Sequence, residues 1–132
     1  MGMLKKIASF FTTHHETREN HSDQELQSRY YKAGQKKVME TVLDILRKEG
    51  GFEISSISEE RGEISVNIHR GRKAFMVITV ISVRPFETAV DLTVTTETML
   101  PMDFGFSRKV ILEFYEKLNQ LIPYIGTNSF ES

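Results

Sequence analysis

The chain has 132 residues, with 17 lysines and arginines against 18 aspartates and glutamates. This length predicts one domain with a sizeable core, and the near balance of charge argues against nucleic acid or an anionic membrane as a partner. No cysteine is present, which excludes disulfides, thiolate metal sites and cysteine nucleophiles. No run approaches the ~18 apolar residues that span a bilayer, and no signal-peptide pattern opens the chain, so we expect a cytoplasmic protein.

The N-terminal region is predicted to be a helix followed by a linker. Residues 3–11 place apolar side chains on one helical face, and we interpret this short helix as cover for exposed core, because so short a basic segment binds a membrane only weakly. Residues 12–23 are polar and lack periodicity, which is typical of a loop. Their histidines, His14, His15 and His21, have no preset geometry, so no metal site is predicted.

Two long helices are predicted, one before and one after the strands in the sequence, and both on the main apolar face of the sheet. The first covers residues 35–48, where a wide apolar stripe ends at Gly50 and Gly51. The second begins near Gly105 and ends before Pro123. The sequence leaves open whether residues 24–33 are helical or extended.

Four strands lie between these helices, at residues 52–58, 63–69, 73–84 and 88–97. The third is rich in β-branched residues and apolar on both faces, so it belongs inside a sheet and needs cover on both sides. What covers its second face is the main functional question that the sequence raises.

The loops between these strands set the expected register. A three-residue loop at residues 70–72 places Ile68 opposite Ala74, and a three-residue loop at residues 85–87 places Leu92 opposite Val80. Both loops gather the apolar side chains on one face. A two-residue second loop would turn the fourth strand's apolar side chains to the wrong face, and we reject it.

The predicted fold is a two-layer α+β domain: a four-stranded antiparallel meander flanked by two long helices, in the order helix-strand-strand-strand-strand-helix, plus a short N-terminal helix. Residues 1–132 form a single domain. Within it, residues 1–28 are the N-terminal helix and polar linker, residues 29–124 the core, and residues 125–132 a flexible tail.

The second face of the central strand is the strongest functional signal, because exposed apolar patches mark interaction surfaces. It carries Phe75, Val77, Ile81 and Val83. Two interpretations stay open: the N-terminal helix or the Tyr30–Tyr31 segment covers these side chains, or a homodimer or partner protein does.

A basic cluster at the tip of the second hairpin comprises His69, Arg70, Arg72 and Lys73. Such a tip could contact phosphates, but it lacks interleaved aromatics and the chain has no basic excess, so a solvated tip is the preferred interpretation.

Residues 94–117 resemble an uncharacterised bacterial family of unknown function, in which a strand leads through a short turn into a helix. The matching residues are Asp103, Phe104, Gly105 and Arg108. Ser107 stands where the family has Asn. The resemblance implies a strand-to-helix connection and no activity.

No catalytic motif is present, and we predict no catalytic residue, cofactor or metal; whether the chain is an enzyme stays open, with the balance against it. The leading hypothesis is a cytoplasmic, non-catalytic, self-associating interaction module. The alternative is a small hydrophobic-ligand-binding protein, whose cleft between sheet and helix would be lined by Met76, Phe106 and Phe114 beside Phe75.

Overall fold

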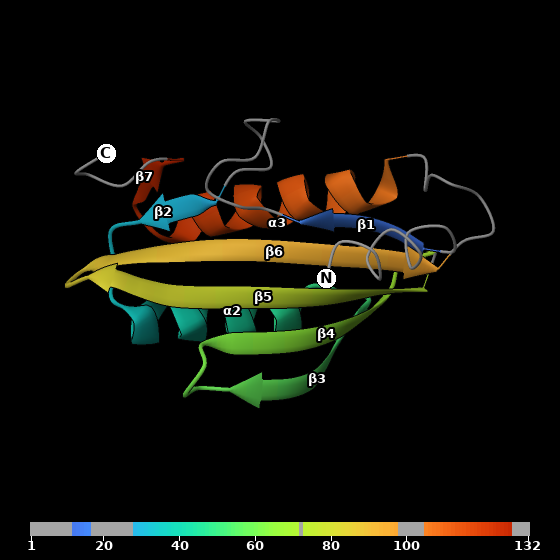
Figure 1. Ribbon diagram of the computed structural model, residues 1–132, viewed down its shortest axis with the longest axis horizontal. Helices are drawn as coiled ribbons and strands as arrows, with labels where there is room; N and C mark the ends of the chain where they lie inside the picture. Colours follow the sequence, from blue (N-terminus) through green and yellow to red (C-terminus); the bar gives the residue numbers. More distant parts are fainter. Residues whose placement is uncertain (1–11, 17–27, 72, 98–104, 128–132) are drawn as a thin grey trace, which may run out of the picture.

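The computed structural model describes residues 12–16, 28–71, 73–97 and 105–127 (Figure 1). Its elements in chain order are β1 (Thr12–Glu16), β2 (Arg29–Tyr31), α2 (Gln35–Lys48), β3 (Phe52–Ser58), β4 (Glu63–His69), β5 (Lys73–Arg84), β6 (Glu87–Glu97), α3 (Phe106–Leu121) and β7 (Tyr124–Gly126). The strands form one antiparallel sheet in the order β3-β4-β5-β6-β2-β7, and β1 also pairs with β6. α2 and α3 pack on the same face of this sheet (Figure 1).

The predicted architecture is wrong in the size of its sheet. The α+β class, the antiparallel pairing and the meander of β3 to β6 are present, but three further strands extend the sheet beyond β6. The predicted four-stranded meander therefore accounts for only part of the sheet. The predicted N-terminal helix at residues 3–11 lies outside the described residues.

The three additional strands are short and are held by pairing with distant segments. β6 is long enough to pair with β2 along its first half and with β1 along its second half. β7 then pairs with the other side of β2. The polar sequence of β1 reads as a linker, and three-residue strands are too short to show a period, so local pattern predicts none of them. The predicted flexible tail begins inside β7.

The register of the β4–β5 hairpin is confirmed, with Ile68 opposite Ala74. That of the β5–β6 hairpin is wrong by two residues, because Leu92 lies opposite Ile78. The loop has two residues, the length that we rejected from the sequence. A bulge between Ser82 and Arg84 accommodates the one extra residue of β5. The apolar side chains of β6 therefore still face the core.

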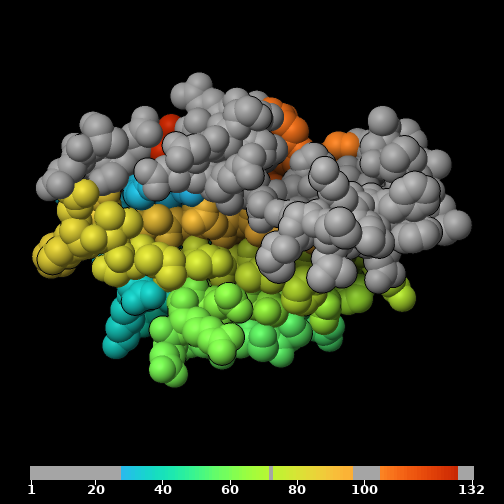
Figure 2. Space-filling view, viewed as in Figure 1, coloured from blue at the N-terminus to red at the C-terminus, as the bar shows by residue number. Residues whose placement is uncertain are grey.

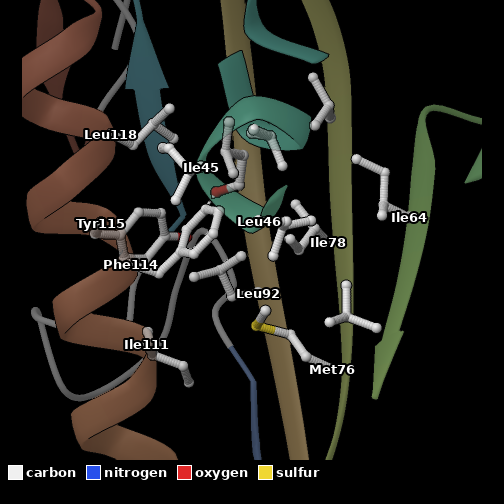
Figure 3. Packing of buried hydrophobic residues seen from close by; sticks show 14 of the residues in the cluster. Ile45, Leu46, Ile64, Met76, Ile78, Leu92, Ile111, Phe114, Tyr115 and Leu118 are labelled. Carbon is white, nitrogen blue, oxygen red and sulfur yellow. Dashed lines mark hydrogen bonds between the residues drawn. The ribbon is translucent and has the colours of Figure 1, made fainter. Parts of the chain in front are cut away.

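The core fills the space between the sheet and the two helices (Figure 3). Alternate residues of β4, β5 and β6 are completely buried on this face, among them Ile64, Ile78 and Leu92. The helices contribute Leu46, Ile111, Phe114 and Leu118. Tyr115 joins the layers, because its hydroxyl donates to the Val90 carbonyl at 2.7 Å.

Candidate functional site

The apolar stripe predicted on β5 lies on the sheet face opposite the helices, which we call the open face. Alternation along the strand turns Phe75, Val77 and Ile81 away from the core, while Met76 and Ile78 between them are fully buried. Phe75 and Ile81 keep 42% and 44% of their surface exposed. Large apolar side chains on an interior strand are thus accessible to solvent.

The stripe ends at the bulge, where Val83 is 42% exposed. On the open face it is flanked by polar residues of the neighbouring strands: Glu63, Ser65 and Asn67 on β4, and Asp91, Thr93 and Thr95 on β6. An apolar centre within a polar rim is the usual composition of a protein interface.

The Tyr30–Tyr31 segment does not cover the stripe. It forms β2, two strands away from β5, where Tyr30 pairs with Ala89. Tyr31 turns to the core and is fully buried. Tyr30 is 5% exposed and shares the open face in one row with Ala89 and Ile81, but Ile81 stays 44% exposed. Of the two segments proposed as internal cover, this one therefore leaves the stripe uncovered, and residues 3–11 lie outside the described residues.

A hollow of about 380 Å³ lies at one end of the stripe, beside the β4–β5 hairpin. Asn67, Phe75 and Thr95 form one row across three strands, and the pair His69 and Lys73 lies beyond them. All five line the hollow. An aromatic ring is thus accessible there between polar and basic neighbours.

An exposed aromatic side chain lies in the turn beyond the opposite end of the stripe. Phe86 is 75% exposed at the tip of the β5–β6 hairpin, which projects at one end of the sheet (Figure 1 and Figure 2). Its φ of 61° lies in the left-handed region, which costs a non-glycine residue about 1–2 kcal/mol. The turn is braced behind it, because Arg84 Nε lies 3.5 Å from a carboxylate oxygen of Glu87, which is 2% exposed.

The predicted basic tip does not gather its cations on one surface. Arg70 turns toward the helices: its Nε donates to the Gly50 carbonyl at 2.9 Å, and its guanidinium nitrogens lie 3.6 Å and 3.8 Å from Glu49 and Glu113. The guanidinium also lies 4.7 Å from the centre of the Phe52 ring. Arg70 therefore ties the hairpin to both helices and does not project from the tip.

The other tip residues have different surroundings. His69 Nε2 lies 3.6 Å from Glu53 Oε1, and Lys73 is exposed beside the hollow. Arg72 lies outside the described residues. The geometry gives no support to a phosphate-binding patch, since Arg70 and His69 already face carboxylates.

The residues of the predicted ligand cleft are packed into the core. Met76 is fully buried, Phe114 is 3% exposed, and Phe106 packs partly buried against them. The cavity beside Phe114 has about 20 Å³, which is room for about one water molecule. The hypothesis of a hydrophobic-ligand site between the layers gains no support from this packing.

A larger cavity of about 390 Å³ lies between the end of α2 and the outer side of α3. It is polar and carries both signs of charge: Glu49, Arg70, Glu113, Glu116, Lys117 and Gln120 line it. Lys117 Nζ lies 3.4 Å from Glu49, which extends the ion pairs of Arg70 into a small network. This network holds the helices together, and sequence analysis did not find it.

A second feature missed from the sequence is an aromatic cluster around β2. The guanidinium of Arg29 lies 4.4 Å from the Tyr115 ring centre and 5.7 Å from that of Tyr124. Tyr31 packs against Tyr124 and donates its hydroxyl to Asn119 Oδ1 at 2.5 Å. Burial raises the pKa of Tyr31 well above its ordinary value, against a smaller lowering by Arg29. The cluster fastens α3 to β2 and β7.

Within the described residues, no group of three or more His, Cys, Asp or Glu side chains could hold a metal ion. Neither helix in that part of the chain is long and apolar enough to cross a membrane.

Comparison with known proteins finds no matching family model and no matching curated protein. Among solved structures, the chain is similar to CalU16 from Micromonospora echinospora, with 12% sequence identity and a TM-score of 0.48. The similarity covers 81% of this chain and 85% of that one. So distant a likeness says nothing about function, and the sequence resemblance at residues 94–117 stays a prediction.

Proposed function

We propose that this protein is a non-catalytic interaction module that associates with a second copy of itself through the apolar stripe of its open face. One observation carries this proposal: Phe75 and Ile81 are each more than 40% exposed although they belong to an interior strand of the sheet. Covering a contiguous exposed apolar surface is favourable by about 25 cal/mol per Å².

A second copy of this chain fits the stripe best, because the stripe is nearly symmetric about its own centre. Val77 and Ile81 lie two residues before and after Thr79, and Phe75 and Val83 lie four residues before and after it. A two-fold axis near Thr79 brings apolar side chains against apolar side chains along the stripe. Self-complementarity of this kind is what an isologous dimer requires.

The other hypotheses have less support from the described residues. The predicted ligand cleft is filled by core side chains, and the residues of the predicted basic tip do not share one surface. A cytoplasmic location belongs to the same proposal, since the absence of cysteine suits a reducing compartment.

The proposal is tested with Ile81→Glu, which places a charge within the apolar stripe. The matched control is Leu121→Glu, since Leu121 is 56% exposed on α3, away from the open face. Sedimentation equilibrium should show a dimer for the parent chain and for Leu121→Glu. Ile81→Glu should be monomeric, with the dimer dissociation constant raised at least 100-fold.

Thermal unfolding shows whether each variant still folds. Each replaces a side chain that is already substantially exposed, so the folded monomer should remain intact. A folded Ile81→Glu that still dimerises with the parent affinity would contradict the proposal. Equal loss of dimer in both variants would also contradict it, because the effect would then not depend on the stripe.

A further inference from the structure

The strand β3 is the longest strand at an outer edge of the described sheet. It has seven residues and stands first in the strand order, so within the described part of the chain it pairs with β4 alone (Figure 1). At the other side of the sheet, β7 has three residues and β1 has five. The outer side of β3 therefore has backbone N–H and C=O groups with which another strand could pair.

The composition of β3 does little to prevent such pairing. Its sequence, FEISSIS, has three apolar residues of high β propensity and contains neither lysine nor proline, which commonly protect an edge strand. Its one charged side chain, Glu53, faces His69, whose Nε2 lies 3.6 Å from Glu53 Oε1. Ile57 is 43% exposed. A segment with low net charge and no proline joins readily to another strand.

The backbone of β3 departs from a regular strand at one residue. Ile54 lies opposite Val66 and Ser56 lies opposite Ser65, so Ser55 is an extra residue in the ladder. Such a bulge bends the strand and increases its twist. The Ser55 hydroxyl donates to the Ser65 carbonyl at 3.1 Å, which holds the extra residue in place. The bulge divides β3 into two segments, residues 52–54 and 56–58.

The two segments do not fit one regular partner strand. Side chains on one face of a strand normally repeat every two residues, but Ile54 and Ile57 both lie on the core side and are three residues apart. A strand in register with the first segment would be out of register by one residue with the second, and such a slip turns its side chains to the wrong face. Each segment alone is at the lower limit of strand length in proteins.

We propose that the bulge at Ser55 closes the outer edge of β3 to strand addition, so that copies of this chain do not join edge to edge into larger sheets. Bulges protect exposed edges in natural sheets by this means. The inference goes beyond the proposed self-association and does not rest on it, because the β3 edge and the open face are different surfaces.

Deletion of Ser55 tests this inference with little change to the fold, since it keeps every pair of the β3–β4 ladder and removes only the interruption. The deletion is made in the Ile81→Glu chain, so that association through the open face does not contribute. Sedimentation velocity should show a weight-average mass raised roughly two-fold or more over that of Ile81→Glu alone. Ser55→Ala in the same chain keeps the extra residue and should leave the mass unchanged.

Hydrogen exchange of residues 52–58 shows where the copies meet. In the deletion chain, the β3 amides that do not bond to β4 should become protected as the assemblies form. Adding Ile57→Lys, which places a charge at the edge, should return the mass to that of Ile81→Glu. A folded deletion chain with an unchanged mass would overturn the inference.

Exchange in the parent chain is a second measurement that needs no deletion. The β3 amides that do not bond to β4 should exchange equally fast at low and high concentration. Protection of these amides that increases with concentration would overturn the inference, because the edge would then already be paired despite the bulge.

Discussion

At the scale of single residues, the pKa of a polar side chain depends on its burial and its hydrogen-bond partners, which the sequence alone does not give. Tyr31 is fully buried and its hydroxyl is held by Asn119, a residue 88 positions away. Burial disfavours the charged phenolate and raises the pKa of Tyr31. No local pattern could predict this, because the partners come from separate elements.

The raised pKa of Tyr31 predicts a loss of stability in alkaline solution. In the unfolded chain the phenol ionises near pH 10, so the contribution of Tyr31 is fully present below pH 10 and declines as the pH rises toward the higher pKa of the folded state. Tyr31→Phe should lower the free energy of unfolding by about 1 kcal/mol at pH 8. It should also reduce the alkaline decline by up to about 1.4 kcal/mol per pH unit.

Urea unfolding of Tyr31→Phe and of the parent chain between pH 8 and pH 11 measures this effect. An unchanged alkaline decline in Tyr31→Phe would show that Tyr31 does not titrate as its burial requires.

The sequence predicted the residues of the stripe, because strand alternation is local. It missed the Arg70 network, because those contacts depend on tertiary packing. Alternation along a strand is local, so the facing of Phe75 and Ile81 follows from position alone. The contacts of Arg70 with Glu49 and Glu113 depend on how the hairpin docks on two helices. The formal charges therefore suggested a basic cluster at the hairpin tip, but the fold turns Arg70 away from the tip toward the helices.

At the scale of elements, the long helices and the strands of the meander were predictable because each is long enough to show its period. α2, β3, β4 and β5 have the predicted bounds. The strands β1, β2 and β7 are three to five residues long and owe their conformation to pairing with β6 or with each other. The β5–β6 register was missed because a bulge leaves no clear mark in a strand that is apolar on both faces.

Gly62 in the β3–β4 turn provides a test of how closely that turn packs on the sheet. Its φ is +67°, and a Cβ there would lie 2.1 Å from the Val80 carbonyl oxygen. Gly71 has a φ of +80° but open space around it. Gly71→Ala should therefore cost only the left-handed strain, about 1 kcal/mol of unfolding free energy, and Gly62→Ala about 2 kcal/mol more.

Chemical denaturation of the two variants gives the comparison directly. Equal costs for Gly62→Ala and Gly71→Ala would mean that the turn is not held against β5 as described. The hydrogen bond from the Val80 amide to the Gly62 carbonyl, at 2.6 Å, would then contribute little.

At the scale of the whole molecule, the described residues form a sheet with α2 and α3 on one face. Among the described residues, the space beside Phe114 in the core has about 20 Å³, which is too little for a sizeable ligand. The open face has an apolar stripe with a hollow at one end. Self-association through this face is the central claim, and it explains why an interior strand has large apolar side chains at the surface.

The solution mass of the parent chain, measured by light scattering across a dilution series in the micromolar range, tests this claim most directly. The account predicts about 30 kDa at high concentration, twice the 15.2 kDa of one chain, falling toward the monomer mass on dilution. A mass of 15.2 kDa at every concentration would contradict it.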